Sequence, residues 1–155
     1  MAYTTTYDLC KAILKAIKSD TALSTFCNTN FAKQPLYFFE IDPDNPPSRD
    51  DMPLIALYMN DVEHSQPGVD VRNIGIGCAI LDDDTATEES TIGLYKGFNT
   101  IEKLETLVFS AIEKFADESA TTPAEISIVE VGNTAIKCYY PYFHSFRQIK
   151  VSTER

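Results

Sequence analysis

The chain has 155 residues, of which 44% are hydrophobic and 23% are charged, as expected for one globular domain with a substantial hydrophobic core. Its 23 acidic side chains outnumber the 13 basic ones and give a formal net charge of −10. This charge argues against specific nucleic-acid binding, because contacts to phosphates need clustered Lys and Arg. No apolar run approaches the roughly 20 residues that span a bilayer, so we expect no association with a membrane.

The cysteines are widely scattered and form no CxxC pair; they are Cys10, Cys27, Cys78 and Cys138. The N-terminus opens Met-Ala-Tyr-Thr-Thr-Thr, without the basic and then apolar segments of a signal peptide. We therefore expect reduced and mostly buried thiols in a cytosolic protein.

Apolar residues at three- or four-residue spacing predict a first helix from about Thr5 to Lys18. Its expected apolar stripe consists of Tyr7, Cys10, Ile13, Leu14 and Ile17. Three lysines lie away from the centre of this stripe, namely Lys11, Lys15 and Lys18. Ser19-Asp20 closes the helix, and Thr21–Asn28 is expected to add a short helical piece.

An aromatic strand is expected at Leu36–Ile41. The segment Asp42–Asp51 holds three prolines and four aspartates and cannot continue a sheet, because proline lacks the donor that the ladder needs. It is predicted to be a long surface loop. The nearly continuous apolar run Pro53–Met59 then predicts a strand covered on both faces.

A second loop is expected around Glu63–Gly68, before a long strand at Val69–Leu81. One face of this strand is bulky and carries Ile74, Ile76, Cys78 and Ile80. The other face is small and carries Gly75, Gly77 and Ala79. A bare face suits the close approach of a helix or of a neighbouring subunit's backbone. The acidic segment Asp82–Ser90 is predicted to be a mobile loop that returns through a short strand at Thr91–Tyr95.

The second long helix is predicted at Thr100–Ala116, with Asn99 and Glu102 forming a capping box. Its buried stripe is expected to be Ile101, Leu104, Leu107, Val108, Ala111, Ile112 and Phe115. The side chains expected to face water are Glu102, Lys103, Glu105, Thr106, Glu113 and Lys114. The polar segment Asp117–Pro123 is expected to end the helix.

The C-terminal part predicts a hairpin with a two-residue turn at Gly132-Asn133, where both residues tolerate positive φ. This register places Val129 opposite Ile136 and Ser127 opposite Cys138. Pro141 is expected to mark a bulge or an edge, and the strand resumes at Phe146–Val151. The fold class that follows is α+β, a single domain over residues 1–155 with a mostly antiparallel sheet, two long helices on one face, and flexible loops at about 42–52 and 82–90.

Five of the eight residues from Tyr139 to Phe146 are aromatic. These rings could stack on the bases of a single-stranded nucleic acid, but that needs a basic groove, and only Lys137, Arg147 and Lys150 are near. About half of the rings are expected in the core. A protein interface is the favoured place for the others, because Tyr and Phe are enriched there.

The sequence offers little for chemistry, and we predict no catalytic residue, no cofactor and no metal ion. The acidic segments Asp42–Asp51 and Asp82–Glu89 lack the ligand spacing and the glycine of a calcium loop. Gly75 and Gly77 form a G-x-G that no helix follows, so they do not predict a phosphate site. A nucleophilic pair of Cys138 and His144 is geometrically possible in a curved strand, although such residues more often belong to a core or an interface.

In its order of elements the chain resembles the tail terminator (tail-completion) or minor tail proteins of long-tailed bacteriophages, which are also encoded by prophages. The resemblance covers most of the chain and rests on layout. The segments that carry it are the helix ending near Lys18, the strands Pro53–Met59 and Val69–Leu81, the helix Thr100–Ala116 and the closing Pro141-Tyr142-Phe143.

This resemblance implies a structural protein without enzymatic activity. It would form a ring, commonly a hexamer, that caps the tail tube, presents a surface to the head–tail connector protein and lets DNA pass through its lumen. The expected location is the virion tail, and the host cytoplasm during assembly. The expected subunit-interface residues are Gly75, Gly77, Ala79, Tyr139, Tyr140, Tyr142 and Phe143. The acidic residues expected at the lumen or its rim are Asp82, Asp83, Asp84, Glu88 and Glu89, although an outward solvated loop explains their charge equally well.

Two alternatives remain open from the sequence. The first is another head–tail joining or tail-tube component, which only the architecture of the assembled particle would distinguish. The second is a cytosolic domain that binds a divalent cation or a small ligand through its acidic loops. That domain would need a concave pocket with convergent carboxylates.

Overall fold

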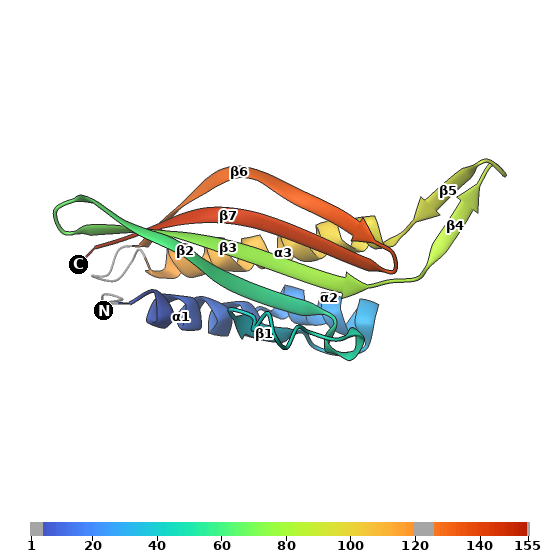
Figure 1. The fold of residues 1–155 in the computed structure, drawn as a ribbon, viewed down its shortest axis with the longest axis horizontal. Helices are drawn as coiled ribbons and strands as arrows, with labels where there is room; N and C mark the ends of the chain where they lie inside the picture. The colour runs from blue at the N-terminus through green and yellow to red at the C-terminus, as the bar shows by residue number, and fades with distance from the viewer. Residues whose placement is uncertain (1–4, 120–125, 155) are drawn as a thin grey trace.

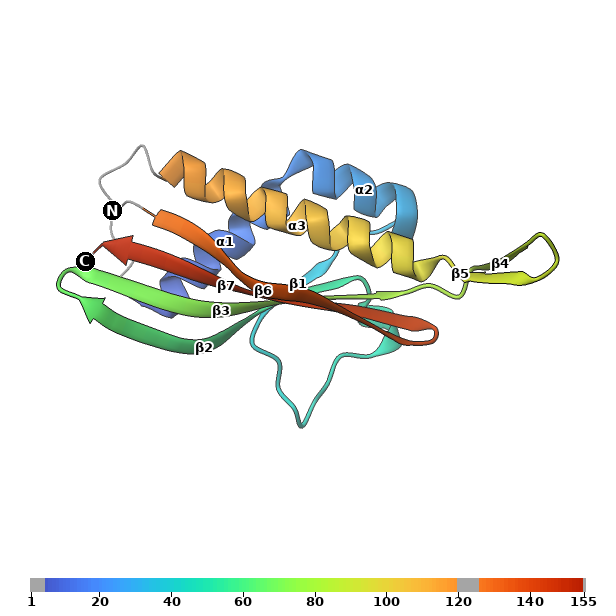
Figure 2. The ribbon, with the colours of Figure 1, turned by 90° about the horizontal axis from the view of Figure 1, so that it is seen from above.

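The computed structural model describes residues 5–119 and 126–154. Over these residues the chain forms a five-stranded sheet with three α-helices on one of its faces, as Figures 1 and 2 show. The strand order is β1-β2-β3-β7-β6, with β1 parallel to β2 and every other neighbouring pair antiparallel. The predicted α+β class is therefore confirmed.

The helices are α1 (Thr6–Ser19), α2 (Thr21–Phe31) and α3 (Gly97–Ser119). The Thr5 hydroxyl caps α1 by accepting from the Asp8 amide at 3.1 Å, and the Asp20 carboxylate caps α2 by accepting from the Leu23 amide at 2.9 Å. The first helix is thus confirmed to within one residue. Its predicted stripe was wrong at one position, because Tyr7 is 59% exposed while Leu9 is buried in its place.

The sheet consists of β1 (Leu36–Phe39), β2 (Leu54–Gln66), β3 (Val69–Leu81), β6 (Ile126–Tyr139) and β7 (Tyr142–Glu154). The predicted strand Val69–Leu81 is confirmed, with its bulky face in the core. The loop expected around Glu63–Gly68 is wrong, because β2 continues to Gln66 and reverses at once into Val69. Its polar residues stay extended because β3 supplies ladder partners along most of the hairpin, with two register shifts near Asp61 and Glu63.

The C-terminal hairpin reverses at Tyr140 and Pro141, whose peptide bond is cis, and not at Gly132-Asn133. The predicted pairs are therefore wrong: Ser127 lies opposite Ser152, and Ile136 lies opposite Ser145. The segment that looked like a turn is accommodated by a register shift between Val131 and Ala135 within one long strand. This arrangement lets β7 lie between β3 and β6 over its full length, which a shorter hairpin would not allow.

Helix α3 begins at Gly97, so the capping box expected from Asn99 and Glu102 is wrong. The Asn99 amide donates to the Lys96 carbonyl within the first turn. Gly97 packs against the ring of Phe143, and a Cβ atom there would lie 2.2 Å from Cε2 of that ring. Only a glycine allows this contact, so the first residue of α3 can lie directly against the Phe143 ring.

The core lies between the sheet and the helices. It is built from α1, α3 and the helix-facing residues of β2, β3 and β7, and its largest fully buried side chains include Leu9, Ile13, Ile55, Leu57, Ile74, Leu104 and Phe143. Glu105 was expected to face water but is only 4% exposed. Its carboxylate lies 2.6 Å from Nε of Arg147, whose guanidinium also stacks 4.1 Å above the ring of Phe109. Burial of this charge is possible because the two side chains neutralise each other.

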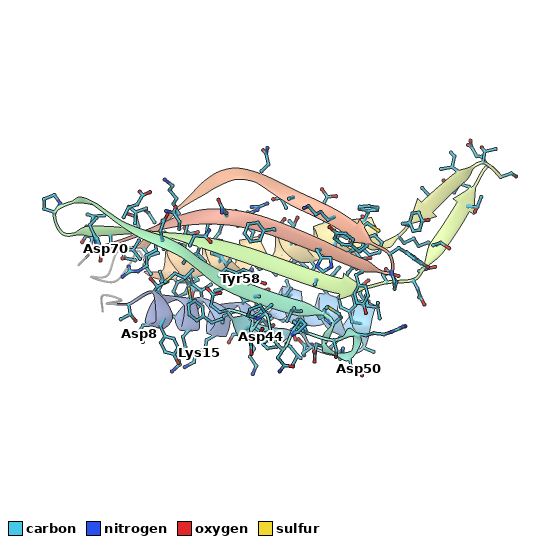
Figure 3. All side chains as sticks on the ribbon, viewed as in Figure 1. Asp8, Lys15, Asp44, Asp50, Tyr58 and Asp70 are labelled. Atoms are coloured by element: carbon cyan, nitrogen blue, oxygen red, sulfur yellow. The ribbon has the colours of Figure 1, made fainter. Side chains whose placement is uncertain are left out.

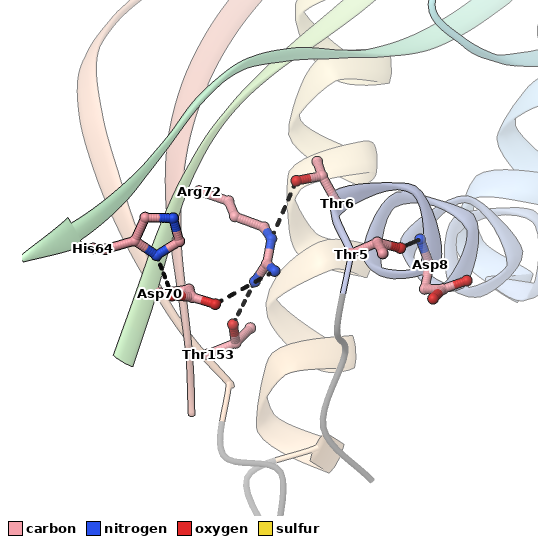
Figure 4. A network of polar contacts seen from close by, with 7 residues as sticks. All are labelled: Thr5, Thr6, Asp8, His64, Asp70, Arg72 and Thr153. Carbon is pink, nitrogen blue, oxygen red and sulfur yellow. Dashed lines mark hydrogen bonds and ion pairs between the residues drawn. The ribbon is translucent and has the colours of Figure 1, made fainter. Parts of the chain in front are cut away.

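A second buried polar network joins the N-terminus of α1 to the sheet (Figure 4). Arg72 of β3 donates to the Thr6 hydroxyl at 3.1 Å and to the Thr153 hydroxyl at 2.6 Å. It also lies 3.7 Å from the Asp70 carboxylate, which contacts Nδ1 of His64 at 2.6 Å. These contacts tie together three elements that are far apart in the sequence, so we assign them a structural role.

Two segments extend from this core. The segment Asp82–Ser90 was expected to be a loop, but Thr85–Glu88 (β4) pairs with Ile92–Tyr95 (β5) in a hairpin that projects beyond the end of the sheet (Figure 1). The returning strand at Thr91–Tyr95 is confirmed. The loop after β1 projects on the side of the sheet away from the helices (Figure 2) and carries one short 3-10 turn, η1 (Arg49–Asp51).

Candidate assembly surfaces

The face of the sheet that the helices leave uncovered carries two packed aromatic rings; we call it the open sheet face. The rings of Tyr58 and Phe146 lie 6.3 Å apart and fill the space above the small residues of β3. A Cβ atom added at Gly75 would lie 2.7 Å from the Phe146 ring, and one added at Gly77 would lie 3.0 Å from the Tyr58 ring. The small-residue face of β3 is thus covered by aromatic side chains of the same chain and not by a helix.

Beside these rings lies a cavity of about 730 Å³, lined by Glu40, Pro46, Met52, Tyr58, Ala79, His144 and Phe146 among others. Ala79 is buried in a small apolar cluster with Met52 and Leu54, against which Tyr142 also packs. Partial burial lowers the pKa of His144 below its usual 6.5, which favours the neutral imidazole. The open sheet face is therefore mostly apolar and aromatic around Tyr58 and Phe146, whereas towards the β2–β3 turn it carries the polar side chains Asp61, Asn73 and Lys150.

The turn between β6 and β7 adds exposed aromatic surface. Tyr139 is 65% exposed and Tyr140 is about half exposed, so both rings are accessible from solvent. Phe143, expected with them, is fully buried in the core and has no surface to offer a neighbouring subunit. The Tyr140 hydroxyl donates to the Asp83 carbonyl at 2.8 Å, and its ring meets that of Tyr95 edge to face at 5.2 Å. Tyr140 thus holds the base of the β4–β5 hairpin against the sheet.

The projecting hairpin, which we call the arm (residues 85–95), has one apolar and acidic face. Ala86 pairs with Leu94 and Glu88 pairs with Ile92, so these four side chains share that face. Ile92 is 44% exposed, and Leu94 and Tyr95 are also exposed, which is unusual for large apolar side chains on a short strand.

The acidic residues of this region divide between the two ends of the arm. Asp82, Asp83 and Asp84 lie at its base, where Asp84 pairs with Lys96 at 3.2 Å. Glu88 and Glu89 lie at its tip. The tip turns through Glu89 and Ser90, which have φ of 52° and 60°. The left-handed region is costly for residues other than glycine, so this turn is strained.

A groove of about 700 Å³ lies between α1 and β1, and we call it the lysine groove. Its basic rim is formed by Lys11, Lys15 and Lys18, and Lys15 points outward from the helix (Figure 3). Its apolar wall includes Tyr7, Leu14, Leu36, Tyr37 and Phe39, and the rings of Tyr7 and Phe39 meet edge to face at 6.1 Å. The sequence placed these lysines off the apolar stripe but did not reveal the groove, which exists only because β1 lies beside α1.

The structure does not support a nucleophilic pair at Cys138. Cys138 lies opposite Phe143 and His144 lies opposite Lys137, so the two side chains point to opposite faces of the sheet. The other cysteines are free and buried, and burial raises the pKa of Cys10 and Cys78 to about 12 and that of Cys27 to about 11. Within residues 5–119 and 126–154, no three His, Cys, Asp or Glu side chains gather in a way that could hold a metal ion.

None of the helices in the described part of the chain is long and apolar enough to cross a membrane. The sequence matches no protein-family model, and no curated protein is significantly similar to it. The arm, the lysine groove and the open sheet face are the exposed features of this chain that could contact a partner.

Proposed function

We propose that the chain is the subunit of a tail-terminator ring of a long-tailed bacteriophage or prophage, a structural protein that caps the tail tube and joins the tail to the head. The observation that carries this proposal is the presence of unlike exposed surfaces on one subunit. A head-to-tail contact that closes into a ring requires two different complementary patches. The arm and the lysine groove are two unlike exposed surfaces on one subunit, and this supports the proposal.

The arm supports association in a second way. An isolated two-stranded hairpin is at best marginally stable in water, and this one leaves Ile92, Leu94 and Tyr95 exposed. A neighbouring subunit that covers Ile92 and Leu94, which share one face of the arm, would stabilise the arm and remove this apolar surface from water. A subunit built for assembly explains why such an arm is retained.

The charge also suits a channel for DNA. Six copies would carry about −60 (6 × −10), and a negative lumen repels phosphates and leaves DNA free to slide. On this proposal Asp82, Asp83 and Asp84, at the base of each arm, line the lumen or its rim. The open sheet face, with Tyr58, Tyr139 and Phe146, is the surface offered to the tail tube protein or to the head–tail connector protein.

Light scattering coupled to gel filtration, over a range of protein concentrations and at two salt concentrations, tests the proposal. The expected species is a ring near 104 kDa (6 × 17.3 kDa), in equilibrium with a 17.3 kDa monomer and favoured when moderate salt screens the repulsion between subunits. Negative-stain electron microscopy should show closed rings with a central hole. A strict monomer at every concentration and salt, with no rings on the grid, would overturn the proposal.

A further inference from the structure

We infer that the arm of each copy binds in the lysine groove of a neighbouring copy of this chain. The inference rests on the proposed ring and specifies the contact that builds it. The occupant of the groove is thus the arm of a second copy of this chain.

The two surfaces match in apolar character. The arm presents Ala86, Ile92 and Leu94 on one face, where cross-strand pairing brings them together. The groove presents a partly exposed wall that includes Tyr7, Leu36 and Phe39. A strand pair lying in such a groove would cover apolar side chains on both partners at once, which drives association.

The two surfaces are opposite in charge. Lys11, Lys15 and Lys18 follow each other at spacings of four and three residues and so occupy one face of α1. Glu88 shares the apolar face of the arm, and Glu89 lies next to it at the tip. Charges of opposite sign on two apolar surfaces fix the register of a contact and speed its formation. A basic groove on a chain of net charge −10 is the natural site for an acidic arm.

The contact must form between copies. The arm projects beyond one end of the sheet, away from the α1–β1 side of the domain, as both views of the ribbon show (Figures 1 and 2). A subunit therefore cannot place its own arm in its own groove without unfolding the base that Tyr140 and Lys96 hold. Each copy would use its arm once and its groove once, which is the arrangement that closes into a ring.

Charge reversal with a mixing step tests the contact. The variant E88K/E89K should fail to form rings alone, and the variant K11E/K15E should also fail alone, each with at least a tenfold rise in the concentration needed for half-assembly. A 1:1 mixture should regain rings, because each reversed arm then meets a reversed groove and each native arm meets a native groove. The matched control E102K/E113K makes the same charge change on exposed positions of α3 and should assemble like the wild type.

A cross-link provides a readout that does not depend on charge. In a C138S background, which removes the partly exposed native thiol, Ile92→Cys and Leu36→Cys introduced together should give a ladder of disulfide-linked multimers under mild oxidation. Either single cysteine should give no ladder beyond a dimer. Circular dichroism of each variant checks that the domain still folds.

The outcomes separate the two proposals. If the wild type forms rings while both charge variants also form rings and no ladder appears, the arm–groove contact is refuted and the ring proposal stands. If the wild type forms no ring at all, both fail. Failure of each charge variant alone, followed by recovery on mixing, supports the contact directly, because misfolded subunits would not recover.

Discussion

The buried pair of Glu105 and Arg147 makes the sharpest prediction about stability. The substitution Glu105→Gln keeps the shape of the side chain but removes the charge that faces the Arg147 guanidinium at 2.6 and 3.2 Å. Removing one partner of a buried ion pair typically costs about 3–5 kcal/mol. We expect the lower end, about 3 kcal/mol, because Arg147 retains its hydrogen bond to Thr134 and its stacking on Phe109.

Urea unfolding at a protein concentration low enough to keep the chain monomeric measures this loss as a shift in the midpoint. Glu102→Gln, an exposed position on the same helix, is the matched control and should change the free energy of unfolding by no more than about 0.5 kcal/mol. The double variant E105M/R147M should return to within about 1 kcal/mol of the wild type, because no buried charge then remains in the pair. A loss below about 1 kcal/mol for Glu105→Gln would refute the burial of the pair.

Three further predictions test the packing. Gly97→Ala should destabilise the domain by about 1–3 kcal/mol in the same urea assay, since its Cβ would collide with the Phe143 ring. A neutral effect would contradict the close contact between Gly97 and this ring. With a thiol reagent near pH 8, the half-buried Cys138 should react faster than the three buried thiols, which should react only as fast as the domain opens. A rapid burst of more than one thiol would argue against the burial of Cys10, Cys27 and Cys78. The pKa of His144 lies below 6.5 in the folded state, so the unfolded state takes up the proton first as the pH falls. The free energy of unfolding should therefore be highest above about pH 6.5 and should decline below that pH. Thermal melts across about pH 5–7.5 should show a smaller decline in His144→Gln.

Local periodicity was enough to predict the elements that carry the core. The strand Val69–Leu81 alternates bulky and small residues from Ile74 to Ile80, and α1 shows a clear apolar spacing, so both were found nearly to the residue. The hairpin turn was misplaced because Gly132-Asn133 has strong local turn preferences, whereas the real reversal at Tyr140 is set by the pairing of β7 with two neighbours. Propensities within a few residues cannot report such long-range pairing.

The buried ion pair and the candidate surfaces were harder to predict, because they too depend on residues that are far apart in the sequence. Glu105 looked like a solvated residue because its cationic partner lies 42 residues further along the chain. The lysine groove depends on β1 lying beside α1, and nothing in either segment alone shows this. Only one of the two strands of the arm was predicted from the sequence, namely the returning strand Thr91–Tyr95. Its partner Thr85–Glu88 was predicted to be a loop, because it lies in an acidic stretch without apolar periodicity.

The irregular edges of the sheet affect how readily this protein aggregates at high concentration. On one side the short β1 pairs only with residues 54–57 of β2, and the rest of β2 is interrupted by register shifts near Asp61 and Glu63. On the other side β6 is interrupted between Val131 and Ala135. Bulged edges with acidic side chains are poor templates for a strand of another molecule. Sheet-to-sheet growth into fibrils is thereby disfavoured at both edges, so this chain can reach a high local concentration without amyloid-like polymerisation.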